Sequence, residues 1–350
     1  MEDKKVFIIS NESVSENLNN YFCDNLDLKS IPEGLSRLFN ITLIARKSKI
    51  LRNHSIQNIN IKLAKNIFSF IYKIIQTLKE KKRAKYLVIS ITPYTFIACI
   101  VFFLFKVKPI VYLRSDGFEE YKSIFGLLGV FIYHLMFTIT YYTSNFISCR
   151  KHILKGKYGI VISPSHLTDK WLNNHTKVNL EKKSLLYVGR IRIEKGIFSF
   201  LELFQNLRNK DVELNIVSTK IDHKKIKQIR NVNLIDTQQE NILINIYDKS
   251  SIFILPSFTE GHPQVLDEAL SRLRPVIVFE EINHVTRERH GVFVCKRNAN
   301  DLDKTIHYIF NNYSEIQSKI KTNKLPTKAA FLNELKLILQ KDNMERWPSG

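Results

Sequence analysis

The feature that most constrains the fold is an alternation of short, continuously apolar runs with longer segments that have apolar residues at helical spacing. Such runs are typical of strands buried on both faces, and alternating strands and helices build parallel sheets covered by helices. In the first half the expected strands are 6–10, 41–45, 86–91, 110–113, 146–149 and 160–163, with helices at 61–82 and 95–107. Asn11-Glu12-Ser13 is expected to form a turn.

The alternation stops at a polar segment, 166–183, and then restarts. The later strands are expected at 185–188, 212–217, 232–235, 252–255, 275–279 and 291–294, and the helices at 196–208, 222–230, 240–247, 263–273 and 300–312. We therefore predict an N-terminal domain over 1–165, a linker over 166–183, a second domain over 184–313 and a helical tail over 314–350, helical around 331–339. Two facing doubly wound, Rossmann-like α/β domains would bind a ligand in the crevice between them, at the carboxyl ends of the strands.

The length of 350 residues, with 44% hydrophobic and 25% charged residues, fits two globular domains. The formal net charge of +20 is unevenly distributed: residues 29–115 hold 17 Lys and Arg against two acidic residues, a net of +15. This excess is consistent with a solvated surface, or with attraction to nucleic acid or an anionic membrane. Charge alone does not choose among the three.

Two apolar stretches raise the question of a membrane. The stretch 95–107 is too short to span a bilayer, whereas 123–142 is long enough. The second contains His134 and many aromatic and β-branched residues, so we expect a buried or membrane-surface helix, with a single span as the alternative, and His134 as a core or interface residue. The start of the chain is too short and too acidic for a signal peptide. The four dispersed cysteines predict reduced packing residues in a cytoplasmic protein, not a zinc site.

The most informative stretch is 251–278, SIFILPSFTEGHPQVLDEALSRLRPVIV. A strand is followed by a loop and then by a helix with Pro263 expected at its first position. Gly261 allows close backbone approach, and the free N–H groups of the helix start suit a phosphate. Glu260 and Glu268 can accept hydrogen bonds from sugar and ribose hydroxyls. The alternative is that both are solvated acids near a helix end.

A second stretch, 185–196, reads LLYVGRIRIEKG. Its strand ends at Gly189, Arg190 follows, and Lys195-Gly196 opens the next helix. Because both cations flank the same expected crevice, Arg190 and Lys195 could neutralise a diphosphate leaving group.

These residues resemble a known family. YVGR followed by EKG, then PSFTEGHPQVLDEAL and RPVIV, are similar to the retaining glycosyltransferases of family 4, which have the GT-B architecture. The resemblance covers about 184–296 and is only architectural over 1–165. It implies that 184–313 binds a nucleotide-sugar donor and that 1–165 is the acceptor side.

The resemblance also assigns roles to single residues. Arg190 and Lys195 match the pair of cations that contacts the donor diphosphate in the family. Glu260 matches the residue that contacts the donor sugar, and Glu268 matches the residue that contacts the ribose. The resemblance therefore makes Arg190, Lys195 and Glu260 the catalytic candidates. The further donor-binding candidates are Gly189, Ile235, Asp236, Gly261, His262, Pro263, Val265 and Leu266.

The sequence also departs from the family. Asn11-Glu12-Ser13 replaces a Gly-rich turn, and Ser218-Thr219-Lys220 another glycine-containing turn. His262 stands where an aromatic is usual, Leu273-Arg274 replace a small residue, and EEINHVTR at 280–287 replaces a Gly-rich loop. These differences leave the donor and the sugar geometry open.

In the first half, YLRSDG at 112–117 follows a strand end. Arg114 and Asp116, with Asn11, are candidates for acceptor binding. A salt bridge that caps a strand is an equally good interpretation of Arg114 and Asp116. The second half has no Asp-x-Asp motif, so we expect no metal and no other cofactor.

We therefore expect a glycosyltransferase that moves a sugar from a nucleoside-diphosphate sugar to an acceptor hydroxyl with retention. The acceptor would be a glycan or lipid-linked glycan of cell-surface polysaccharide synthesis, such as lipopolysaccharide or capsule. The protein would be cytoplasmic and peripheral to the inner membrane leaflet, held by the anionic membrane surface. The alternatives are a nucleotide-sugar epimerase of related fold and a basic nucleic-acid-binding protein. Against the nucleic-acid-binding alternative, the sequence shows no zinc finger, no RNP-type strand and no evident helix-turn-helix, so we expect no nucleic-acid partner.

Overall fold

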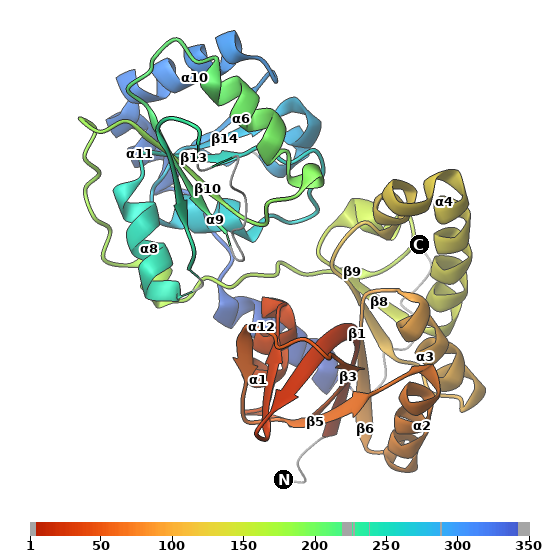
Figure 1. Ribbon diagram of the computed structural model, residues 1–350. Coiled ribbons are helices and arrows are strands. Elements are labelled where there is room, and N and C mark those ends of the chain that lie inside the picture. Colours follow the sequence, from red (N-terminus) through yellow and green to blue (C-terminus); the bar gives the residue numbers. More distant parts are fainter. Residues whose placement is uncertain (1–4, 219–225, 227, 238, 288, 342–350) are drawn as a thin grey trace. The chain divides into compact units, whose positions relative to one another are not determined.

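The computed structural model describes residues 5–218, 226, 228–237, 239–287 and 289–341. They form two compact units: an N-terminal unit, 5–164 with 329–341, and a C-terminal unit, 165–328 (Figure 1). Each unit has its own hydrophobic core around a parallel sheet, as the alternation predicts. All four cysteines are free and buried, as expected.

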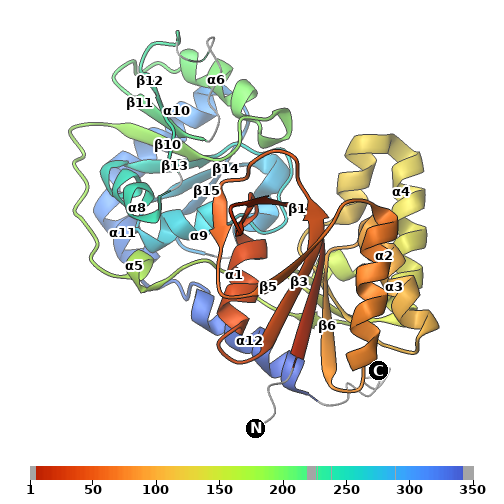
Figure 2. The same ribbon diagram turned by 60° about the horizontal axis from the view of Figure 1, so that its bottom comes forward.

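The N-terminal sheet runs in the parallel order β5-β3-β1-β6-β7-β8-β9. Its strands are β1 (Lys5–Asn17), β3 (Asn40–Lys47), β5 (Asn60–Ala64), β6 (Ala84–Ile89), β7 (Ile110–Leu113), β8 (Asn145–Ser148) and β9 (Ile160–Val161). Helices α1 (Leu26–Leu35) and α12 (Lys328–Gln340) cover one face, and α2 (Ile67–Thr77), α3 (Pro93–Leu104) and α4 (Gly117–Thr143) cover the other (Figures 1 and 2).

The turn predicted at Asn11-Glu12-Ser13 is wrong. β1 continues through these residues, with a register shift between Ile9 and Ser13 that marks an irregularity in its pairing with β3. The strand then turns back at Leu18-Asn19, both with positive φ, and pairs antiparallel with β2 (Asn20–Cys23), which pairs with β4 (His54–Ile56). Positive φ at both turn residues suits the right-handed twist of a two-residue hairpin.

The helix predicted at 61–82 is shorter, because residues 60–64 form β5. α2 begins after Asn66, whose side chain accepts the backbone N–H of Ser69 at 2.9 Å in a capping box, and a 3₁₀ turn, η1 (Leu78–Glu80), follows. α1 was missed altogether. Its start is fixed by Asn25, which accepts the N–H of Asp27 at 2.9 Å.

α4 is longer than the predicted 123–142 and is interrupted at Gly126, whose φ of 63° and ψ of −145° are not helical. It is not the buried helix that we considered: only 28% of its most apolar window is buried. By length and composition it could cross a membrane. His134 is exposed on it, so its assignment to the core is wrong.

The C-terminal sheet is parallel in the order β12-β11-β10-β13-β14-β15. Its strands are β10 (Ser184–Val188), β11 (Glu213–Val217), β12 (Val232–Ile235), β13 (Ile252–Leu255), β14 (Val276–Phe279) and β15 (Val292–Cys295). Its helices include α6 (Ile197–Gln205), α8 (Glu240–Lys249), α9 (Gln264–Ser271), α10 (Ala299–Asn311) and α11 (Tyr313–Ile320). Most of the helix predicted at 222–230 lies outside the described residues.

The predicted linker and tail are parts of the cores. Residues 166–183 contain α5 (Asp169–Leu172), and Leu167, Trp171 and Val178 are buried in the C-terminal core. The predicted tail, 314–350, is divided between the units. Tyr313, Ile316 and Ile320 of α11 are buried in the C-terminal core, whereas Phe331 and Leu335 of α12 are buried in the N-terminal core.

Candidate active site

Two loops meet at the carboxyl edge of the C-terminal sheet, because the neighbouring strands β10 and β13 are parallel. The loop after β10 contains the short 3₁₀ turn η3 (Ile193–Lys195), and the loop after β13 leads to α9. The N–H of Phe258 in the second loop donates to the carbonyl oxygen of Glu194 in the first at 3.1 Å. The two sequence motifs thus form one site.

Gly196 is required where the two loops approach each other. Its φ of 64° lies in the left-handed region, and a Cβ at this position would collide with the carbonyl oxygen of Pro256. Both conditions favour glycine. The geometry of Gly196 therefore fixes the position of Lys195 relative to the second loop.

Lys195 and Glu260 form an ion pair. The Lys195 Nζ lies 2.6 Å from Glu260 Oε1, and the Ser257 hydroxyl donates to the same oxygen at 2.7 Å. The two charged side chains are only 23% and 11% exposed. Glu260 is therefore not a solvated acid at a helix end. In this arrangement Lys195 is held by Glu260, so contact with a diphosphate would require the pair to rearrange.

Arg190 is exposed, and its guanidinium makes no hydrogen bond or ion pair with the residues that the structure describes. Its backbone is held by a hydrogen bond from the Tyr187 hydroxyl to the Arg190 carbonyl, at 2.8 Å. The N–H of Gly189 donates to the carbonyl of Val217 on β11 at 3.0 Å. Gly189 and Arg190 thus extend from the strand edge with the cationic side chain available to a ligand.

The start of α9 differs slightly from the prediction. Pro263 is the N-cap, and the helix begins at Gln264. Gly261 and Val265 are half-buried and Leu266 is fully buried. Val265 and Leu266 therefore offer a ligand mainly backbone, in keeping with a predicted site at the helix start.

The His262 side chain lies within a charged cluster. Its Nε2 is 3.4 Å from Asp267 Oδ2, and its Nδ1 is 2.6 Å from a guanidinium nitrogen of Arg287. Asp267 is also paired with Arg289, and burial lowers the pKa of Arg289 to about 10. Since the imidazole is only 4% exposed, any contact of His262 with a donor would use its backbone.

Glu268 is 8% exposed, and its Oε2 accepts a hydrogen bond from the Tyr247 hydroxyl at 2.9 Å. Burial raises the pKa of Glu268, and the hydrogen bond from Tyr247 counteracts part of that rise. It too is not a solvated helix-end acid. A carboxylate held in this way can accept hydrogen bonds from hydroxyl groups of a ligand.

Ile235 and Asp236 lie at the end of β12, two strands from β10 in the sheet order. The carbonyl of Ile235 accepts the N–H of Ser218 at 3.1 Å, and Asp236 is exposed. They share the carboxyl edge with the two loops, and their contact with a base remains a prediction.

The N-terminal candidates are occupied by contacts within their own unit. The Arg114 guanidinium donates to Asn25 at 2.9 Å, to Asp27 at 3.2 Å and to Glu12 at 3.3 Å. This network is the salt bridge at a strand end that we named as the alternative.

Asp116 and Asn11 are also engaged. Asp116 caps α4 by accepting the N–H of Phe118 at 3.0 Å and pairs with Lys155 at 2.6 Å. The Asn11 side chain accepts a hydrogen bond from Arg46 at 3.4 Å. A role of these residues in acceptor binding remains a prediction.

Sequence reasoning missed Arg297, which follows β15. Its Nη2 donates to the carbonyl of Pro256 at 2.9 Å, its Nε donates to Glu281 at 2.6 Å, and its guanidinium lies 4.3 Å from the ring centres of Phe258 and Phe279. Arg297 therefore holds the second loop in place. No sequence motif marks it, because its partners come from the ends of two other strands, β13 and β14.

Within the described part of the chain, no group of three or more His, Cys, Asp and Glu side chains could hold a metal ion. The expectation of a metal-free reaction is therefore left to experiment.

Comparison with known proteins places this site in a recognised domain. Residues 182–312 match the family model described as glycosyl transferases group 1. An uncharacterized glycosyltransferase of Haemophilus influenzae is 30% identical over 146 residues, which cover 38% of this chain and 41% of that protein. The alignment thus spans less than half of the relative.

Solved structures match over nearly the whole chain. HepE of Anabaena in complex with UDP has a TM-score of 0.71 at 10% identity, covering 96% of this chain and 99% of that one. WaaG, a glycosyltransferase involved in lipopolysaccharide biosynthesis, has a TM-score of 0.68 at 11% sequence identity, covering 96% of this chain and 100% of that one. Sucrose-phosphate synthase of Thermosynechococcus elongatus has a TM-score of 0.66 at 11% sequence identity, covering 95% of this chain and 98% of that one. Within the C-terminal unit, residues 182–312 thus match the glycosyl transferases group 1 model, and the two α/β units of the chain have the fold of solved GT-B glycosyltransferases.

Proposed function

We propose that the protein is a glycosyltransferase that moves a sugar, with retention, from a nucleoside-diphosphate sugar to an acceptor hydroxyl. One observation carries the proposal: Lys195, Glu260 and Ser257 form a partly buried charged site at the carboxyl edge of the sheet, inside the region that matches the family. The same region contains Arg190 and the buried carboxylate of Glu268. These are the groups that a diphosphate and a sugar require.

The chemistry depends on stabilising the leaving group. The bond between the anomeric carbon and the diphosphate breaks, and its electron pair leaves with the diphosphate. The oxygen of the acceptor hydroxyl bonds to the anomeric carbon in its place, and the proton of that hydroxyl passes to the departing diphosphate. Negative charge then grows on the diphosphate, and preorganised cations and helix N-termini lower the barrier most when they face such charge. Arg190, Lys195 and the start of α9 would supply them. Lys195 would exchange part of its contact with Glu260 for the phosphate, which frees Glu260 to accept from the sugar.

A nucleotide-sugar donor is supported by the similar structures, since HepE of Anabaena was solved with UDP and with UDP-glucose. The test is a thermal-shift screen of the wild-type protein against UDP-, GDP- and ADP-sugars, because a ligand that binds only the folded state raises its apparent stability. At least one donor should stabilise the protein, and Lys195→Ala should reduce the effect.

A product assay separates the transferase from the epimerase. With donor and acceptor glycan, a transferase releases nucleoside diphosphate and forms a glycoside. Formation of a free sugar isomer without a glycoside would instead support the epimerase.

We further propose that the acceptor is a glycan or lipid-linked glycan of cell-surface polysaccharide synthesis, and that the protein works in the cytoplasm on the inner membrane leaflet. The supporting feature is α4, whose exposed apolar side chains gather around its break at Gly126. Leu127 is 83% exposed, and Phe131 and Leu128 are 67% and 66% exposed. Two basic side chains lie against the same helix: Lys155 over the Phe118 ring and Lys157 over the Tyr141 ring. An exposed apolar surface on a helix that also holds cations favours an anionic bilayer.

Flotation with vesicles tests this location. The protein should float with anionic vesicles at low salt and less with neutral ones, because each Lys or Arg near an anionic surface contributes about 1 kcal/mol. Leu127→Asp should reduce flotation, whereas Ile242→Asp, on an exposed apolar position of the C-terminal unit, should not. Equal flotation of the two variants would contradict the proposal. Extraction of the cellular protein only by detergent would show that α4 spans the membrane.

A further inference from the structure

The hydrogen bond between Tyr247 and Glu268 joins a residue with an expected role in donor binding to one that no motif marks. Tyr247 lies on α8 and is fully buried, and its hydroxyl donates to Glu268 Oε2 at 2.9 Å. The other carboxylate oxygen of Glu268 makes no hydrogen bond to a residue that the structure describes. One oxygen is thus anchored by the protein, and one is left for a ligand.

We propose that Tyr247 is a positioning residue for the donor nucleotide: its hydroxyl fixes one oxygen of Glu268, so that the second oxygen accepts a ribose hydroxyl. This inference rests on the proposed donor site. Tyr247 itself does not touch the nucleotide; it acts through Glu268. A carboxylate whose rotation is already restricted loses less conformational freedom when it binds a hydroxyl, which is the benefit of preorganisation.

The Tyr247 ring has little freedom to move. It packs edge-to-face against Trp171, with ring centres 5.5 Å apart, and in a tilted arrangement against Phe253 of β13, with ring centres 5.6 Å apart. Its backbone carbonyl accepts a hydrogen bond from Arg274 Nε at 2.9 Å. Side chains from α5, β13 and the segment after α9 therefore fix the position of the hydroxyl.

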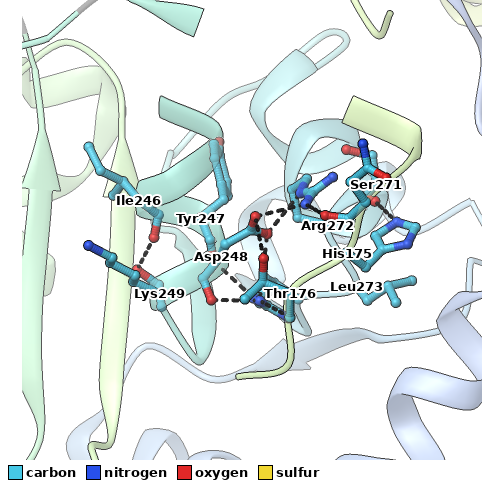
Figure 3. Close-up of polar contacts among 12 residues, drawn as sticks. His175, Thr176, Ile246, Tyr247, Asp248, Lys249, Ser271, Arg272 and Leu273 are labelled. Atoms are coloured by element: carbon cyan, nitrogen blue, oxygen red, sulfur yellow. Dashed lines mark hydrogen bonds and ion pairs between the residues drawn. The ribbon is translucent and has the colours of Figure 1, made fainter. Parts of the chain in front are cut away.

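The next residue, Asp248, anchors the end of α8 (Figure 3). Its carboxylate accepts two hydrogen bonds from Arg272, at 2.8 and 2.7 Å, and one from the Thr176 hydroxyl at 3.3 Å. Arg272 and Arg274 are both 1% exposed. Tyr247 is thus the point at which a rigid, buried polar cluster reaches Glu268.

The geometry makes a specific prediction for the conservative variant Tyr247→Phe, which removes one hydroxyl and leaves the ring. The affinity for a ribonucleoside diphosphate should fall about tenfold, the effect of a single hydrogen bond to a charged group. A nucleotide that lacks the ribose hydroxyl bound by Glu268 cannot donate a hydrogen bond to the second carboxylate oxygen of Glu268. Its affinity should be nearly the same in wild type and variant, and kcat at saturating donor should change little.

The experiment uses calorimetric titration of the full chain. The probes are whichever of UDP, GDP and ADP binds wild type most tightly, and its 2′-deoxy and 3′-deoxy analogues. Tyr313→Phe is the matched control, because its hydroxyl donates to the carbonyl of Ser251 at 2.6 Å in the same core. This control should lower thermal stability and leave all the affinities unchanged.

The outcomes separate the inference from the proposed function. A loss in Tyr247→Phe for the ribonucleotide, with little or no loss for at least one of the two deoxy analogues, supports the positioning role. An equal loss of affinity for all three probes in Tyr247→Phe means that Tyr247 is only structural. No loss of affinity means that Glu268 needs no anchor. Either result overturns the inference and leaves the proposed donor site intact. If wild type binds none of the nucleotides, the proposed donor site is wrong and the inference falls with it.

The pH dependence gives a second readout. Burial raises the pKa of Glu268, the Tyr247 hydroxyl and His166 lower it, and Glu240 raises it. Since the ionised carboxylate is the better acceptor, donor affinity should fall as the pH drops through this raised pKa. Removing the Tyr247 hydroxyl takes away a stabilising contact of the ionised form, so the loss should begin at a higher pH in Tyr247→Phe. Coincident pH profiles for wild type and variant would contradict the positioning role.

Discussion

Arg272→Leu should strongly destabilise the C-terminal unit. Arg272 is 1% exposed, donates two hydrogen bonds to Asp248, and donates to the backbone carbonyls of Trp171, Asn173 and Asn174 at 2.7–3.0 Å. It joins α8 and α9 to the segment before β10 (Figure 3). Leucine fills part of the space, but it makes none of these bonds.

The magnitude follows from the partner that remains. Removing one member of a buried ion pair costs about 3–5 kcal/mol, because the other charge stays buried and loses its main partner. Asp248 would keep the Thr176 hydroxyl at 3.3 Å and the more distant Arg274 at 3.7 Å. The carbonyls of Asn173 and Asn174 add little, since these residues are exposed and water can replace the guanidinium. For a unit of this size the loss corresponds to a decrease in Tm of about 6–20 °C. It is a large part of a typical total stability of about 5–15 kcal/mol.

Trp171 allows the measurement to be confined to this unit. Its indole is buried and its carbonyl is one of the acceptors of Arg272. Fluorescence of Trp171 in a Trp347→Phe background would follow thermal and urea unfolding. Arg230→Leu, at an exposed arginine of the same unit, should change stability by less than about 0.5 kcal/mol. A loss below about 1 kcal/mol for Arg272→Leu would refute the reasoning.

Three further predictions concern the site. Arg190→Ala and Lys195→Ala should each lower the single-turnover rate by about a hundredfold or more. Glu268→Ala should mainly weaken donor binding. Near-wild-type single-turnover rates in folded Arg190→Ala and Lys195→Ala would exclude the assignment of these two residues to the diphosphate. Excess EDTA should leave the transfer rate unchanged, because cations of the protein take the role of a metal; a loss restored by magnesium or manganese would contradict this. Gly196→Ala should weaken both donor affinity and thermal stability, because a Cβ there would collide with the carbonyl of Pro256; unchanged titration and melting curves would show that the loops can separate without cost.

Elements set by local pattern could be predicted from the sequence. The strands at 110–113 and 252–255 are confirmed residue for residue, because continuous apolar runs between polar breaks determine them. The strand at 232–235 is also confirmed, although the polar Asn233 interrupts its apolar run. The prediction failed at 60–64, where helical apolar spacing concealed a strand and the cap at Asn66 set the true helix start. It also failed at 11–13, where β1 continues through an irregular pairing with β3 to a hairpin in place of the expected turn.

The same distinction holds for the site. The motifs located Arg190, Lys195, Glu260 and Glu268, and the structure brings Lys195 and Glu260 into contact. The supporting residues could not be found in this way. Tyr247 lies 21 positions from Glu268, and Arg297 lies 41 positions from Pro256. Such pairs depend on which strands are neighbours in the sheet, and no local period encodes that order.

Hydrogen–deuterium exchange of the wild-type protein, with and without the nucleoside diphosphate that stabilises it, tests the central claim most directly. The claim is that the nucleotide binds at the carboxyl edge of β10 and β13. Backbone amides of 189–196 and 256–268 should exchange more slowly when the nucleotide is bound, because their loops and the start of α9 would contact it. Protection confined to the N-terminal unit, or no change in these two segments at saturating nucleotide, would contradict the account.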